Sequence, residues 1–272
     1  MNAPARCPLG NHAEGPPYVT YARMDELHEL AAPRTDSPQE LTFILISQVK
    51  ELLFRIVHTE LDQARTHLRA DRPGDACARL AAAIRSLRVL ISAWEVVSGM
   101  APDEFLAFRD VLGEASGTQS FMYRTLEFLL GNKDPVSVAW CADHLDRYPS
   151  LRAELSGPSL YDEVLAFLAR RGNPLPERLL VGGGQHSHDP AVEEVWSRVY
   201  RSPSEHPEEY RLAEALMEVS YQFARWRSTH LLVVERMLGD KPGTGGTTGV
   251  SWLRSINGHR FFPELWSVRS HL

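Results

Sequence analysis

Apolar residues recur every three or four positions along three long stretches without proline, residues 39–72, 74–101 and 208–241. This spacing places them on one face of a helix, whereas a proline inside a helix costs about 3 kcal/mol. We therefore expect three long amphipathic helices. Their apolar stripes are Phe43, Ile46, Val49, Leu53, Ile56, Val57 and Leu61; Leu80, Ile84, Leu87, Ile91, Trp94 and Val97; and Leu212, Leu216, Val219, Phe223, Trp226, Leu231, Val234 and Leu238.

Shorter helical patterns occupy much of the remaining chain, and the strict alternation typical of strands is scarce. We therefore expect an all-α fold, with one helical domain over residues 36–272. Six prolines fall within the first 38 residues, so residues 1–35 are predicted to form a largely extended N-terminal arm. Two segments rich in turn-forming residues, 170–190 and 239–250, are predicted to be loops. The shorter predicted helices are 102–111, 119–131, 134–146, 159–171 and 190–200.

Composition and charge narrow the classes of function. The chain has 35 acidic and 29 basic residues, a formal charge of −6, which makes it a poor candidate for binding nucleic acid. No apolar run approaches the ~20 residues of a membrane span, and no signal-peptide pattern is present. Cys7, Cys77 and Cys141 lie far apart and form no CxxC pair, so we expect unpaired thiols. These features indicate a cytoplasmic protein that binds no membrane.

Two loops carry residues that can bind ligands. The 239–250 loop holds five glycines, but it follows a helix and lacks the Gly-Lys-Ser/Thr of a phosphate-binding loop. It is either a flexible lid over a small ligand or a helix terminator. His186 and His188, beside Asp189, have a spacing that suits a metal ion. Without further ligands nearby, this pattern favours a solvated loop.

Two residues on the predicted helices allow sharper hypotheses. His230, on the third long helix, is either a core histidine or the single axial ligand by which helical proteins commonly hold haem iron. Arg109 lies one turn after Phe105. It either binds a substrate carboxylate with both arms of its guanidinium or pairs with Asp103 or Asp110. The residue types alone leave these alternatives open.

Five segments of the chain resemble the tryptophan 2,3-dioxygenase family of haem-dependent oxygenases, in the family's order. The most specific features are the RxxH sequence around His230, the GTGG that follows it, and a terminal FPELW with Arg269 beyond. The resemblance implies a helical bundle that binds haem b, uses O2, acts on tryptophan or a related amino acid, and assembles as a homotetramer. The segments are YVTYARMDELHEL (18–30), LTFILISQVKELLFRIVHTELD (41–62), PDEFLAFRDVLGEASGTQSFMYRTLEFLLGNK (102–133), FARWRSTHLLVVERMLGDKPGTGGTTGVSWLR (223–254) and FFPELW (261–266).

The resemblance also implies roles for particular residues. His230 stands where the family has its iron ligand, and Arg109 where it binds the substrate carboxylate. Thr244 matches the residue that contacts the substrate's ammonium or carboxylate group as the loop closes. Phe43 and Phe105 match aromatic positions that would sandwich the indole ring.

Four further residues take their implied roles from the same resemblance. Ser116 and Gly117 match a pair that approaches the haem from the side opposite the iron ligand. Tyr18 and Tyr21 match tyrosines of an N-terminal arm that completes the site of a neighbouring subunit in the homotetramer.

One departure from the family is central. The family usually has FxxxHQ, with a histidine facing the indole N–H, whereas this chain has Ser47 four residues after Phe43. A hydroxyl can accept the N–H hydrogen bond, but it is no base near pH 7. Thr118 stands where the family usually has phenylalanine. Both smaller residues leave room for a substituted tryptophan such as β-methyltryptophan.

These departures favour monooxygenation, in which one oxygen atom enters the indole ring, a 2-oxindole forms and an external reductant such as ascorbate is consumed. The alternative is cleavage of the C2–C3 bond by both oxygen atoms, which gives N-formylkynurenine. A third hypothesis is a non-catalytic haem or tryptophan sensor. The joint presence of Arg109, His230 and Thr244 argues against it, because a sensor need not keep both an iron ligand and a full substrate clamp.

Overall fold

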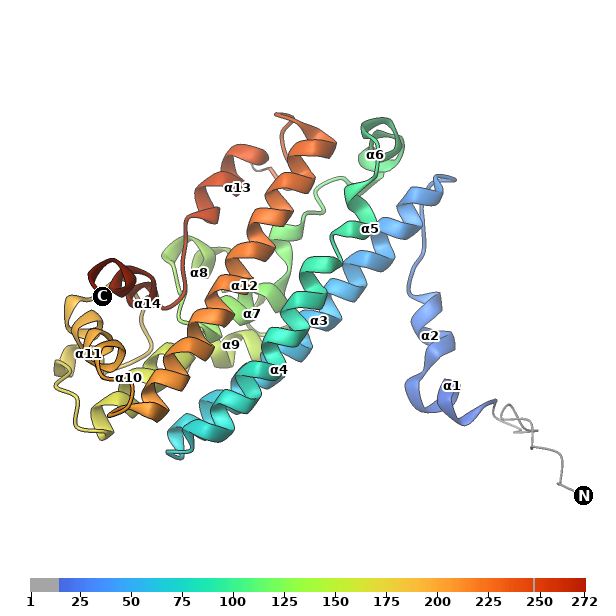
Figure 1. Ribbon diagram of the computed structural model, residues 1–272. Coiled ribbons are helices and arrows are strands. Elements are labelled where there is room, and N and C mark those ends of the chain that lie inside the picture. The colour runs from blue at the N-terminus through green and yellow to red at the C-terminus, as the bar shows by residue number, and fades with distance from the viewer. Residues whose placement is uncertain (1–14, 247) are drawn as a thin grey trace, which may run out of the picture.

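The computed structural model describes residues 15–246 and 248–272, which form helices and turns without any strand. This confirms the all-α prediction. The three expected long helices are α3 (Pro38–Arg69), α4 (Pro73–Ser92) and α12 (Pro207–Leu238). Each begins at a proline, whose missing N–H has no partner to lose in the first turn. Helix α4 packs along both α3 and α12, and the three run side by side through the molecule (Figure 1).

The second long helix is shorter than its apolar pattern predicted. It ends at Ser92, and a separate turn, α5 (Glu95–Ser98), follows. Ala93 and Trp94 keep right-handed helical dihedral angles, so the interruption is a tightened turn rather than a break. Both residues are buried, and the Trp94 indole packs against aromatic rings of α12. This tertiary packing has no sequence signal such as proline or glycine.

The predicted shorter helices all form, and three other α-helices appear between residues 149 and 267. Helices α9 (Pro149–Ser156), α13 (Val250–Asn257) and α14 (Pro263–Ser267) lie outside the predicted segments. Helix α14 spans only five residues, too few turns to produce a periodic pattern. The helices within the predicted segments are α6 (Pro102–Arg109), α7 (Phe121–Leu129), α8 (Pro135–Cys141), α10 (Leu160–Arg170) and α11 (Pro190–Arg201).

The main hydrophobic core lies between the long helices, where most of the predicted apolar stripes are buried. Val49 and Ile56 are exceptions, with 42% and 48% of their surface exposed. They belong to a row of exposed apolar residues along α3, spaced three or four apart, that we call the α3 apolar stripe. It consists of Leu41, Leu45, Val49, Leu52 and Ile56.

The described part of the N-terminal arm is helical, which corrects the prediction of an extended segment. It forms α1 (Pro17–Ala22) and α2 (Met24–Glu29), separated by Arg23 at a positive φ of 51°. Two of the prolines that suggested extension, Pro16 and Pro17, lie at the start of α1, where proline favours a helix. Figure 1 shows both helices standing apart from the bundle, on the side of α3. A hydrogen bond of 3.3 Å from Gln48 Nε2 to the Leu30 carbonyl ties the segment after α2 to α3.

Cys77 and Cys141 are free thiols, as expected, and Cys7 lies outside the described residues. None of the described helices combines the length and the apolar character needed to span a bilayer.

Candidate functional site

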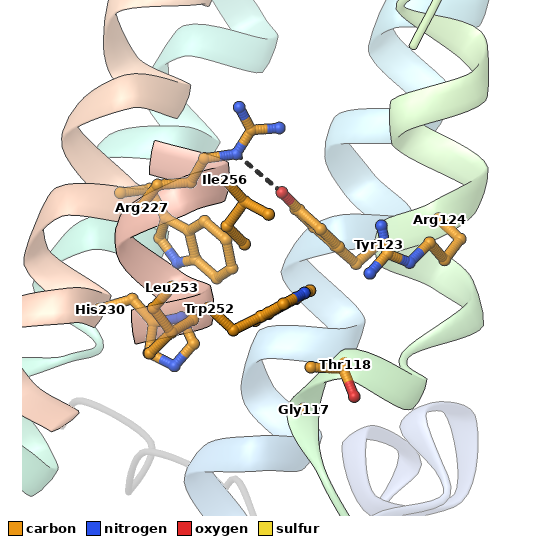
Figure 2. Close-up of a pocket in the computed structure, with 10 residues that line it drawn as sticks. Gly117, Thr118, Tyr123, Arg124, Arg227, His230, Trp252, Leu253 and Ile256 are labelled. Atoms are coloured by element: carbon orange, nitrogen blue, oxygen red, sulfur yellow. Dashed lines mark hydrogen bonds between the residues drawn. The ribbon is translucent and has the colours of Figure 1, made fainter. Parts of the chain in front are cut away.

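His230 lies beside a cleft between α12, α13 and the segment that leads into α7. Helix α12 contributes Trp226 and His230, and α13 contributes Trp252 from the facing side. Gly117 and Thr118 line the cleft next to the start of α7 (Figure 2). His230 and Gly117, which are far apart in sequence, therefore line the same cleft.

The environment of His230 keeps its imidazole neutral. Its ring stacks on Trp94, with centroids 4.5 Å apart and planes 10° apart. Burial and the nearby charge of Lys50 lower the pKa of His230 to about 3. Among the described residues, the imidazole forms no hydrogen bond. A neutral imidazole with an unused nitrogen lone pair is the form that binds a metal ion.

A buried charge network holds the helix that carries His230. Arg227 Nε donates to the Tyr123 hydroxyl at 2.8 Å (Figure 2), and Arg227 Nη2 donates to Glu127 Oε1 at 2.9 Å. Arg124 also pairs with Glu127. Burial raises the pKa of Tyr123 to about 12, so its phenol stays protonated at neutral pH. These bonds fix α12 against α7, and thereby fix the position of His230.

Three phenylalanines form a cluster where α3 meets α6. The ring of Phe43 lies 5.9 Å from that of Phe105 and 5.5 Å from that of Phe108, centroid to centroid. Phe105 and Phe108 are buried, and Phe43 is half-buried. Direct contact between Phe43 and Phe105 leaves no space for an indole between them, so the expected sandwich is not present. The accessible part of the cluster is the ring of Phe43.

Arg109 follows this cluster at the end of α6 and points to the glycine-rich loop. Its Nη2 donates to the Pro242 carbonyl at 2.5 Å, while its Nε is buried without a hydrogen-bond partner. Arg109 forms no ion pair with the described residues Asp103 or Asp110, which the sequence left open as partners. A guanidinium whose other N–H donors are unused among the described residues suits a further acceptor such as a carboxylate.

The glycine-rich loop is fastened against the segment that precedes α7. Thr244 Oγ1 donates to the Ala115 carbonyl at 2.6 Å. A Cβ atom on Gly245 would lie 2.5 Å from the Cβ of Ser116, so this approach requires glycine. The loop therefore joins Arg109, Thr244 and the Ser116–Gly117 turn in one assembly beside the cleft.

Ser47 lies on α3 one turn after Phe43. Its hydroxyl donates to the Phe43 carbonyl at 2.7 Å. Because this bond uses the only hydroxyl proton, the oxygen is left to act as an acceptor. The Ser47 side chain can thus accept a hydrogen bond from an N–H group, as the sequence analysis required of it.

Tyr18 and Tyr21 are not brought to this site. They lie on α1, where 70% and 93% of their surface is exposed. Their expected role in a neighbouring subunit therefore stays a prediction.

The two loop histidines have partners of their own. His186 Nε2 lies 2.8 Å from Asp162 Oδ1, and its ring stacks on Tyr161. His188 pairs with Glu193. His186 is consequently packed against α10 and not solvated, which corrects the expectation for this loop.

Two residues of the site were not expected from the sequence. The sequence analysis expects Trp94 only as a member of an apolar stripe, and it does not single out Lys50. Yet Phe43, Ser47 and Lys50 are spaced four and three residues apart, which places them on one face of α3. That spacing is a signal that could have identified Lys50.

The cleft suits a flat, largely apolar cofactor with a metal ion. The imidazole of His230 offers a nitrogen ligand, and aromatic rings surround it. The indole N–H groups of Trp94 and Trp226 are buried without a partner. These residues fit haem, whose iron His230 would hold through its imidazole nitrogen.

Comparisons with known proteins agree with these features. The family model for tryptophan 2,3-dioxygenase matches residues 7–171 and 166–272. The chain is 42% identical over 257 residues to tryptophan 2,3-dioxygenase of Burkholderia pseudomallei strain K96243, covering 94% of this chain and 84% of that relative. The enzymes of that name from Burkholderia cenocepacia and Burkholderia ambifaria are also 42% identical over 257 residues, covering 94% of this chain and 83% of each relative.

Proposed function

The chain belongs to the tryptophan 2,3-dioxygenase family of haem-dependent oxygenases, and on that premise we propose that it opens the indole ring of L-tryptophan with O2 to form N-formylkynurenine. The observation that carries the proposal is the assembly of Arg109, the Thr244 loop and the Gly117 turn beside the neutral imidazole of His230. We assign the haem domain to residues 36–272 and the arm to residues 1–35, in a cytoplasmic enzyme whose cysteines are unpaired.

Each residue of this assembly binds a different part of the substrate. The guanidinium of Arg109 holds the substrate carboxylate through N–H donors that make no bond with the described residues. The hydroxyl of Thr244 donates its proton to Ala115, so its oxygen accepts a hydrogen bond from the substrate ammonium. Phe43 packs against the indole ring. The loop is already fastened to Ala115, so it excludes water from the substrate once it is bound.

The protein also sets the polarity around the reacting carbons. His230 would hold the iron of haem b, which would supply the activation of O2. Ser47 accepts the hydrogen bond from the indole N–H and thereby orients the C2–C3 bond. A hydroxyl cannot remove the indole proton near pH 7, so Ser47 orients the ring without acting as a base.

A second candidate function is monooxygenation to a 2-oxindole, with β-methyltryptophan as a possible substrate and ascorbate as a reductant of the required kind. The presence of Ser47 and Thr118 at the site favours it, since both are smaller than the family's usual residues. The comparisons lend it no support, because the relatives named above are tryptophan 2,3-dioxygenases. Ring opening therefore takes precedence.

The proposal includes a homotetramer in which the arm of one subunit completes the site of another. The tyrosines of α1 are exposed in the single chain, and the α3 apolar stripe lies uncovered along the helix that carries Phe43 and Ser47. The arm helices stand apart from their own bundle. A second copy whose arm covers this stripe would bury both sets of side chains.

The test is the mass of the product formed under 18O2 from L-tryptophan and from β-methyltryptophan, with and without ascorbate. Two labelled oxygen atoms in the product, without need of ascorbate, are expected for ring opening. One labelled atom that depends on ascorbate would establish the 2-oxindole reaction instead. A His230→Ala variant should lose the Soret absorption band of the haem. A coloured wild-type protein that turns over neither amino acid would indicate the sensor.

A further inference from the structure

Lys50 is a charged residue that the proposed reaction does not use. It lies one turn after Ser47 on α3, and its Nζ is 3.4 Å from the centroid of the Trp94 indole ring. The same indole stacks on the imidazole of His230. The ammonium group therefore ends beside the candidate iron ligand, in a half-buried position.

No acidic group of the described residues balances this charge. None of their carboxylates lies within 4.0 Å of the Lys50 ammonium. The adjacent Glu51 is hydrogen-bonded to Ser120, and the buried Glu127 is held by two arginines. Burial without a counter-ion lowers the pKa of Lys50 to about 7. A half-buried cation that forms no ion pair within the described residues can accept an anion from outside the protein.

The position of Lys50 along α3 indicates which anion it binds. Lys50 lies seven positions after Phe43, about 10 Å further along the helix axis. Phe43 contacts the helix that ends in Arg109, which is the end assigned to the substrate carboxylate. Lys50 lies at the other end, beside Trp94 and His230. The only charged groups on a haem macrocycle are its two propionate carboxylates.

We propose that Lys50 binds a propionate carboxylate of the haem and thereby holds the macrocycle in place against His230. The inference rests on the proposed haem-binding function and deepens it, because it assigns the cofactor's carboxylate to a residue of α3. The Trp94 ring supports the ammonium through a cation–π contact, and a carboxylate supplies the charge-assisted hydrogen bond that the protein does not.

The experiment measures how fast haem is lost to apomyoglobin, followed by the Soret band, from protein loaded with haem b or with its dimethyl ester. The variants are Lys50→Met, Lys50→Arg and, as a control, Arg55→Met, which removes an exposed charge from the same helix. Lys50→Met should lose haem b about tenfold faster than the wild type, the effect of one charge-assisted hydrogen bond. Both should lose the dimethyl ester at the same rate.

The two remaining variants should retain haem. Lys50→Arg keeps the charge and should hold haem b nearly as long as the wild type, and Arg55→Met should match the wild type. Equal acceleration of haem b and ester loss in Lys50→Met would mean that Lys50 only packs, and would overturn the inference. Unchanged haem loss with a raised Kd for L-tryptophan would assign Lys50 to the substrate carboxylate and would overturn it as well. A wild-type protein that takes up no haem would instead overturn the proposed function.

Discussion

At the scale of single residues, the hydroxyl of Ser47 leads to a prediction about substrate binding. Its proton is given to the Phe43 carbonyl, so its oxygen can only accept a bond from the indole N–H. Ser47→Ala should raise the KM for L-tryptophan by about fivefold, the effect of one neutral hydrogen bond. 1-Methyl-L-tryptophan has no indole N–H, and its KM should not change. An equal rise for both substrates would show that the hydroxyl does not contact the indole nitrogen.

The sequence predicted candidate site residues only where they belong to a motif of the family. The family resemblance placed His230, Arg109 and Thr244 in one site, and the structure brings their segments together. The sequence did not identify Trp94 and Lys50 as site residues, because their contacts join helices that are distant in sequence. An amphipathic pattern tells which face of a helix is inward, but it does not tell which ring or charge will meet there.

At the scale of elements, the glycine-rich loop leads to a prediction about closure. The Cβ of a Gly245→Ala variant would meet the Cβ of Ser116 at 2.5 Å, so the loop must move away from the Ser116–Gly117 turn. We expect kcat/KM for L-tryptophan to fall about tenfold or more, since small displacements of a positioning segment are costly. Steady-state kinetics with Gly258→Ala as the control test this, because a Cβ there meets only an ordinary contact at 3.9 Å.

A compensating variant separates this clash from other effects of the alanine. Ser116→Gly removes the atom that the new Cβ meets, so the double variant Gly245→Ala/Ser116→Gly should recover more activity than the product of the two single effects predicts. Independent effects of the two substitutions would contradict the close approach of the loop to the turn.

The contact between His186, in the segment 172–189, and Asp162, on helix α10, leads to a prediction about stability at acid pH. Burial raises the pKa of the Asp162 carboxyl, but hydrogen bonds from His186 and Ser159 outweigh this effect and lower it to about 2. A depressed pKa stabilises the fold above the ordinary value near 3.8, and this stability is lost as the pH falls toward 2. Asp162→Asn should reduce the free energy of unfolding at pH 6 by about 2 kcal/mol.

Urea unfolding between pH 6 and pH 2.5 measures this contribution. The difference between the wild type and Asp162→Asn should shrink through the acid range, because protonation gives the wild type the same uncharged side chain. Asp143→Asn, on an exposed side chain, is the control and should leave the unfolding free energy nearly unchanged. A difference that does not depend on pH would assign the effect to packing.

The same scale shows why helices were easier to predict than their ends. Proline marks the start of α3, α4 and α12, and the long apolar stripes define their lengths. The stop at Ser92 depends on where the Trp94 indole packs, and the short helix α14 carries too few turns to produce a periodic pattern. The periodicity of apolar residues therefore does not predict where a helix ends when tertiary contacts determine that end.

At the scale of the whole molecule, exposed apolar side chains occur on both the arm and the bundle. The long helices bury their stripes against one another, whereas the α3 apolar stripe and the tyrosines of α1 remain open. Val49 and Ile56 were expected in the core because their spacing matches it. A stripe that faces another copy of the chain has the same period as one that faces the core, so sequence periodicity cannot separate the two.

Exchange of arms between subunits predicts that two different inactive variants restore activity when they assemble together. A protein without residues 1–22 lacks Tyr18 and Tyr21 and should have at most a tenth of the wild-type activity, because its sites are left incomplete. Full-length Arg109→Ala should also be inactive, through loss of the carboxylate clamp. The truncated protein and full-length Arg109→Ala are mixed, unfolded and refolded together with fresh haem. This mixture should regain activity, because the arm of an Arg109→Ala subunit can complete the site of a truncated subunit.

The same mixture refolded from full-length Arg109→Ala and full-length Thr244→Ala is the control, since both defects then lie within the body of the subunit and neither arm can repair them. Size-exclusion chromatography with light scattering gives the mass of the active species. Activity restored in a species no larger than one chain, or a truncated monomer with full activity, would contradict arm exchange. Restoration confined to mixed oligomers would place a substrate-site residue of each subunit on its neighbour's arm.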